Sequence, residues 1–156
     1  MPNWAEGTIK VRGTKNQIID YLSDTLECVD FLGNDIKIEI LDDGTTITFK
    51  GEDVFYFKGT QRGFVRTEDN ILSFDFWGEP ETIEIIEMPF KQAWAVEASE
   101  FVKLSKKHGV DIKIFTFERG MGFTQEIEII KGKITRNKTI KYENYQWDVP
   151  FNSLGG

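Results

Sequence analysis

The fold is decided by residues 82–123, TIEIIEMPFKQAWAVEASEFVKLSKKHGVDIKIFTFERGMGF. Isoleucines nearly alternate with polar side chains over residues 82–87, which predicts a half-buried strand that ends at Pro89. Apolar side chains then recur every three to four residues, which predicts a helix over residues 94–108. Residues 110–118 alternate again and predict a second strand. The whole stretch is therefore expected to fold as half of a split β-α-β unit, with the apolar side of the helix on the sheet.

A second unit of the same kind opens the chain. Residues 4–12 alternate as a strand, and Thr14 with Gln17 forms a capping-box pattern at the start of a helix. Residues 36–41 supply the strand that follows. Two such units predict an α+β, ferredoxin-like core, in which two helices pack on an antiparallel or mixed sheet and a β-meander is inserted at about residues 45–77. Two smaller β-α-β halves lying side by side are the alternative.

Composition limits the classes of function. The 156 residues, 40% of them apolar, predict a single domain over residues 1–156 with a well-filled core. The lone Cys excludes an intramolecular disulfide, and the absence of a Cys/His cluster predicts no metal and no cofactor. No signal-peptide pattern and no membrane-length apolar run is present, which predicts a cytoplasmic protein. The net charge of −7 argues against direct binding of nucleic acid.

This net charge is unevenly distributed. Residues 67–90 contain seven acids and no base, whereas residues 131–141 contain five bases and no acid. The two segments either pair as neighbouring strands and neutralise each other, or the acids form a docking face for a protein partner, with the further option that they imitate the phosphates of a nucleic acid. The predicted acidic docking face consists of Glu68, Asp69, Asp75, Glu79, Glu81, Glu84 and Glu87.

Three stretches resemble a known family. They are MPNWAEGTIKVRG (residues 1–13), the helix ending LSKKHG (104–109) and ERGMGF (118–123). These stretches are similar to the YubB ferredoxin-like proteins, which bacteriophages, plasmids and other mobile elements carry. The similarity covers about residues 1–27 and 82–130. It implies a ferredoxin-like fold and an origin on a mobile element, but no particular activity, because the family is largely uncharacterised and a fold does not define a function.

No catalytic residue is predicted. The single thiol, Cys28, and the single imidazole, His108, each fall at the C-terminal end of a predicted helix. The negative end of the helix dipole raises the pKa of a thiol, whereas nucleophilic catalysis needs a lowered one. The chain is therefore expected to be a non-enzymatic protein-binding module, whose partner is a protein of the host or of the mobile element.

The glycine-containing corner at residues 120–123 allows two interpretations. Glycine within a strand pattern is typical of a β-bulge, which is the structural interpretation. The functional alternative is an apolar recess around Trp94 and Met121 that would hold a small ligand or serve an unrecognised enzyme. Self-association through a free sheet edge is a third hypothesis. The predicted recess consists of Trp4, Trp94, Glu118, Arg119, Met121 and Phe123.

Overall fold

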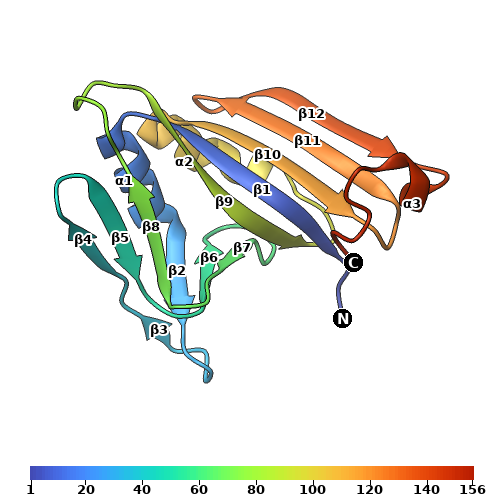
Figure 1. The fold of residues 1–156 in the computed structure, drawn as a ribbon, viewed down its shortest axis with the longest axis horizontal. Helices are drawn as coiled ribbons and strands as arrows, with labels where there is room; N and C mark the ends of the chain where they lie inside the picture. Colours follow the sequence, from blue (N-terminus) through green and yellow to red (C-terminus); the bar gives the residue numbers. More distant parts are fainter.

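Twelve strands and three short helices follow one another along residues 1–156, all of which the computed structural model describes (Figure 1). None of the helices is long and apolar enough to cross a lipid bilayer. The elements are β1 Trp4–Gly13, α1 Lys15–Thr25, β2 Leu26–Val29, β3 Asp35–Ile36, β4 Glu39–Asp42, β5 Thr46–Lys50, β6 Val54–Phe57, β7 Phe64–Arg66, β8 Ile71–Asp75, β9 Glu84–Ala93, α2 Ser99–His108, β10 Asp111–Glu118, β11 Phe123–Ile130, β12 Lys133–Lys141 and α3 Tyr145–Asp148.

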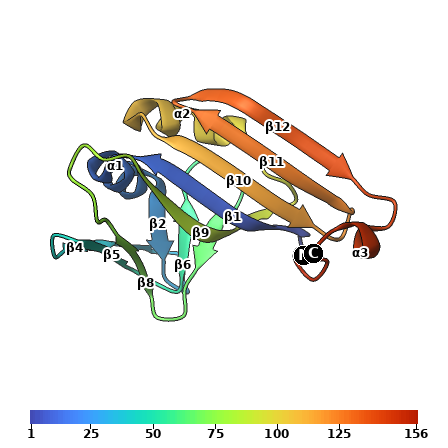
Figure 2. The same cartoon turned by 45° about the horizontal axis from the view of Figure 1, so that its top comes forward.

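The strands form two antiparallel sheets. The large sheet has nine strands in the order β12-β11-β10-β1-β9-β7-β6-β2-β3, and the small sheet has the order β4-β5-β8. Figure 1 shows the small sheet beside α1, away from the long strands β9 to β12. Figure 2 shows that both chain termini lie together at one end of β1, next to α3.

β1 is the strand from which the large sheet is built. It pairs with β9 from Trp4↔Ala93 to Gly13↔Glu84, and on its other side it pairs with β10. Gly7 is required within it, because a Cβ added there would overlap the carbonyl oxygen of Phe115 on β10. β1 therefore fixes how closely β10 can approach.

One hydrophobic core joins the helices to both sheets. Alternate side chains of β1, such as Ile9 and Val11, point to the same face as those of β10 and pack with Ile18 of α1 and Phe101 of α2. The same cluster takes in the small sheet through residues such as Phe49. The opposite face of the large sheet carries neither α1 nor α2, and α3 packs there against Phe117 of β10.

The prediction of a ferredoxin-like α+β core is wrong: the chain is mostly β, with short helices. α1 leads into β2, which lies beyond β9, β7 and β6 rather than beside β1. The expected meander is also divided, since β5 and β8 belong to the small sheet and β6 and β7 to the large one. The alternation of side chains predicted the four strands of this meander, β5 to β8. It carries no information about which strands become neighbours.

Several boundaries within residues 82–123 also differ from the prediction. β9 does not end at Pro89 but continues to Ala93. β7 bridges β9 at the single pair Phe64↔Lys91, so the missing N–H of Pro89 costs no ladder bond on that edge. α2 begins at Ser99 rather than at Trp94. The positive φ of Trp94, 67°, excludes this residue from a right-handed helix.

Two predicted helix ends are confirmed. Thr14 and Gln17 form the reciprocal capping box at the start of α1, and Gly109 adopts the left-handed conformation (φ 65°) after α2. An acidic side chain then ties the two helices together. Asp24 Oδ2 accepts a hydrogen bond from Lys107 Nζ at 2.7 Å and lies 2.8 Å from His108 Nε2. The bond from Lys107, followed by that with His108, lowers the pKa of Asp24 from 3.8 to about 2.

Replacing Gly7 tests the contact between β1 and β10. We expect Gly7→Ala to lower the free energy of unfolding by about 3 kcal/mol, because the added methyl group must displace backbone atoms rather than a flexible side chain. Urea denaturation measures this loss. Thr8→Ala, at the next position of β1, is the control and should cost below about 1 kcal/mol. Equal losses in the two variants would contradict the close approach at Gly7.

The Asp24 contact predicts a pH dependence of stability. A lowered carboxyl pKa stabilises the folded state above the ordinary value of 3.8, and this stabilisation disappears as the pH falls towards 2. Asp24→Asn should therefore shift the urea midpoint downward at neutral pH, and its difference from the unmodified protein should shrink below about pH 4. Asp20→Asn, at an exposed position of the same helix, is the control and should show no such convergence.

Candidate functional site

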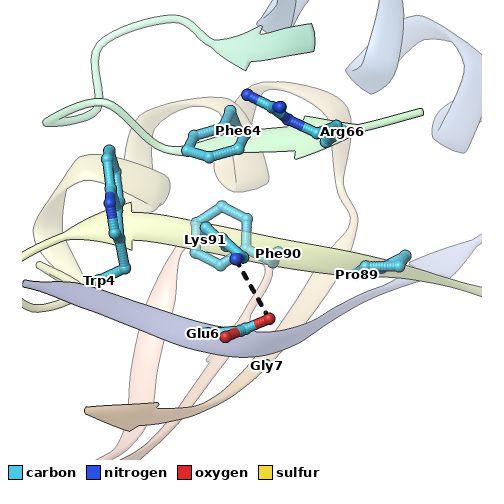
Figure 3. Close-up of a pocket in the computed structure, with 8 residues that line it drawn as sticks. All are labelled: Trp4, Glu6, Gly7, Phe64, Arg66, Pro89, Phe90 and Lys91. Atoms are coloured by element: carbon cyan, nitrogen blue, oxygen red, sulfur yellow. Dashed lines mark ion pairs between the residues drawn. The ribbon is translucent and has the colours of Figure 1, made fainter. Parts of the chain in front are cut away.

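A recess of about 380 Å³ lies where β1, β7 and β9 meet, on the face of the large sheet opposite α1 and α2 (Figure 3). Three strands supply its walls, because β9 pairs with β1 on one edge and with β7 on the other. The recess is lined by Trp4, Glu6, Gly7, Phe64, Arg66, Pro89, Phe90 and Lys91.

An aromatic wall closes one side of the recess. Trp4 on β1 and Phe64 on β7 meet edge to face, with ring centroids 5.3 Å apart and planes at 88°. Tyr56 of β6 lies behind Phe64, at a centroid distance of 6.1 Å. Such pairs fix both rings, which makes them a rigid surface for an apolar group. Figure 3 shows the Trp4 ring standing at the end of the recess and Phe64 along its upper side.

The polar groups of the recess carry an excess of positive charge. Lys91 Nζ lies 3.3 Å from Glu6 Oε1, and Glu6 Oε2 accepts a hydrogen bond of 2.9 Å from the backbone N–H of Gly155. The exposed Arg66 forms no ion pair with any acid of the chain. The carboxylate of Glu6 is thus engaged twice, whereas the guanidinium of Arg66 keeps all its donors available.

The lining of the recess limits the chemistry it can carry. No Ser, Cys or His lines the recess, so a Ser–His or Cys–His pair is absent from it. The thiol of Cys28 is buried in β2, where desolvation raises its pKa. No group of three or more His, Cys, Asp and Glu side chains forms a metal-binding arrangement. An aromatic wall beside a free guanidinium can hold an apolar group that carries a carboxylate.

The six residues of the predicted recess do not line this pocket together, although Glu118 pairs with Phe123 and binds the backbone of Met121. Only Trp4 lines the recess described above. Trp94 and Met121 are exposed, and Phe123 is half-buried at the start of β11. Arg119 lies at a separate hollow formed with α3 and the residues after it. The chain thus brings none of the other five to the side chain of Trp4 within this recess.

Glu118 has a structural role. It is 1% exposed, and its carboxylate accepts hydrogen bonds from the backbone N–H groups of Gly120 at 2.7 Å and Met121 at 2.8 Å. Residues 119–122 form the turn between β10 and β11, so the corner is not the predicted β-bulge. The register of β10 with β11 is regular, and the irregularity between Glu128 and Ile129 belongs to the next pairing, of β11 with β12.

The predicted acidic docking face is divided between the two ends of β8. Glu68 and Asp69 precede this strand, whereas Glu79 and Glu81 follow it. Asp75, at the end of β8, accepts a hydrogen bond from Thr46. Glu84 accepts hydrogen bonds from the backbone N–H groups of Trp77 and Gly78. The carboxylate of Glu87 lies 3.7 Å from Lys10 Nζ. None of the seven acids pairs with residues 131–141, because β12 lies beside β11 and Arg136 binds Glu126 at 2.7 Å.

Sequence reasoning missed Glu6, Phe64, Arg66 and Lys91. Each occupies an ordinary strand position, and they come from three strands far apart in the chain. A basic and an aromatic residue two positions apart on β7 (Phe64 and Arg66) were the one available signal, since such residues share a face of the strand.

Removing the Glu118 carboxylate tests its structural role. Glu118→Ala should lower the free energy of unfolding by about 2 kcal/mol, because two backbone N–H groups of the turn lose their buried carboxylate acceptor. Glu118→Gln keeps one acceptor oxygen and should cost less. Glu143→Ala, at an exposed position, is the control for the charge change. Thermal denaturation that ranks Glu118→Ala with the control would contradict this role.

Comparison with protein-family models, with curated proteins and with solved structures finds no match to this chain. The resemblance to the YubB proteins therefore stays a prediction from the sequence. The geometry of the recess carries the functional inference.

Proposed function

We propose that this chain is a non-enzymatic protein-binding module, and that the recess between β1, β7 and β9 receives an aromatic or long apolar side chain of its partner. The observation that carries this proposal is the edge-to-face pair of Trp4 and Phe64 beside Arg66, which has no acid partner of its own. Buried anchors of this kind supply most of the energy of protein interfaces. The partner is expected to carry an acid next to its anchor, which Arg66 would bind.

The shape of the recess supports a protein partner. It is bounded by β1, β7 and β9, and Arg66 and Pro89 in its lining are exposed (Figure 3). The exposed Pro89 and half-buried Lys91 continue its floor along β9, so a neighbouring part of the partner has surface to contact. A central anchor surrounded by a polar rim is the usual anatomy of such interfaces.

A small ligand is the second candidate. The volume of about 380 Å³ falls within the range of pockets that bind small molecules, and an aromatic carboxylate would meet the same three groups. Such a ligand would be bound without the contacts along β9. The two candidates therefore differ in whether residues beyond the anchor add affinity.

Two further parts of the proposal rest on the sequence. The resemblance of residues 1–27 and 82–130 to the YubB proteins supports an origin on a phage or plasmid. A cytoplasmic location is supported by the single cysteine, Cys28, which is buried and free. The partner would then be a protein of the host cell or of the mobile element.

Selection from a displayed library of random peptides tests the proposal. We expect enriched peptides to share an aromatic residue next to Asp or Glu, and to bind Trp4→Ala and Arg66→Glu at least about tenfold more weakly than the unmodified protein, because each variant removes one of the two contacts. Calorimetric titration with synthetic peptides measures the affinities. Arg62→Glu changes an exposed arginine outside the recess and is the matched control.

Binding that is unchanged in both recess variants would remove the proposal. If a single aromatic acid binds as tightly as the longer peptides, the small-ligand candidate is favoured instead. The melting temperatures of the variants establish that each still folds.

A further inference from the structure

We propose a second interaction surface, separate from the recess: the free edge of β12 binds an extended acidic segment of a protein as a tenth strand of the large sheet. β12 is the outermost strand and pairs with β11 alone. Figures 1 and 2 show no element on its other side. A strand with one unpaired edge presents a row of backbone N–H and C=O groups that an extended segment can join.

The side chains of β12 define which segment fits. All nine residues of the strand are exposed. Residues 131–141 carry five bases and no acid, so the rest of the chain has a charge of −7 − 5 = −12. A basic segment without acids thus lies at one sheet edge of an acidic protein, and an opposite charge on the incoming strand would complement it.

Most of these charges are free. Arg136 binds Glu126 of β11 at 2.7 Å. Lys138 is the register partner of Glu126, but it forms no ion pair, because that carboxylate is occupied by Arg136. Lys133 and Lys141 form no ion pair either. An incoming strand would therefore meet basic side chains that β11 has not neutralised.

The pairing between β11 and β12 already shows the complementarity required. Glu126 and Glu128 on β11 stand opposite Lys138 and Arg136 on β12. Residues 136 and 138 are two apart and project to one face, so an acid at every second position of the new strand would reach them. Arg136 and Lys138 would then have acids of β11 on one side and acids of the new strand on the other.

The register irregularity between Glu128 and Ile129 limits where the new strand can pair. Thr135 falls at this irregularity, and its hydroxyl donates to the side chain of Glu128 at 2.8 Å. The regular part of the edge is Arg136–Lys141, beyond the bulge. Bulges and lysines are features that keep sheet edges from pairing with identical edges. Here they leave the edge open to a strand of opposite charge.

Other occupants fit less well. Two copies of β12 would place bases opposite bases, which is destabilising across a strand pair. A nucleic acid would be attracted to the lysines but repelled by the remaining charge of −12, and it cannot form the backbone ladder. The acidic strand is the occupant that uses both the charges and the free backbone groups.

Two synthetic peptides of alternating Glu and Val test the proposal, one unmodified and one N-methylated at alternate residues so that its backbone cannot pair. We expect the unmodified peptide to bind and the methylated one not to bind in a fluorescence anisotropy titration. Amide hydrogen exchange should slow within residues 136–141 when the peptide is bound. Arg136→Glu with Lys138→Glu, whose side chains share one face of β12, should weaken binding by at least about tenfold. Lys37→Glu with Lys58→Glu, both exposed, makes the same change in net charge and is the control.

Equal binding of the two peptides would overturn strand addition and leave only charge attraction. Tighter binding of a short DNA duplex than of the peptide would assign the edge to nucleic acid and overturn the proposal. A molar mass that rises with protein concentration and blocks peptide binding would assign the edge to a second copy instead. Peptide binding that persists in Trp4→Ala would show that this edge acts independently of the recess.

Discussion

The pairing of β1 with β9 on one side and β10 on the other is the constraint on which the structure depends. β1 comes from the start of the chain, whereas β9 and β10 come from its second half, and Gly7 permits the approach of β10 because any larger residue would meet the Phe115 carbonyl. Once this ladder forms, α1 and α2 are brought onto one face, where Asp24 links them. The opposite face carries the recess between β1, β7 and β9, and α3 packs on it at Phe117.

The recess follows from the same pairing. β9 extends through Pro89 to Ala93, so that it reaches both Trp4 of β1 and Phe64 of β7. The rings of Trp4 and Phe64 then meet across β9, which lies between β1 and β7. The charges around them are unequal because Glu6 contacts both Lys91 and the backbone of Gly155, whereas Arg66 forms no ion pair. Rigid aromatic contact and an unsatisfied cation are the two properties on which recognition would rest.

The outer edge of the sheet has a different character. β12 lies three places from β1, contributes little to the core and carries free basic side chains. Glu126 of β11 neutralises one of these side chains, Arg136. The other basic side chains of β12 face solvent or a partner. Both proposed surfaces would favour an acidic partner, the recess by binding an anchor side chain and the edge of β12 by pairing with a backbone.

The sequence by itself determined the local elements: the capping box of Thr14 and Gln17, the helix end at Gly109 and the alternation of the strands, because these signals arise from residues close together in the chain. Of the recess, it indicated Trp4 alone. Only the tertiary structure decided the strand order, the division into two sheets and the meeting of Trp4 with Phe64. The physical reason is that alternation specifies which face of a strand is buried, whereas its neighbours are selected by packing between residues far apart in sequence.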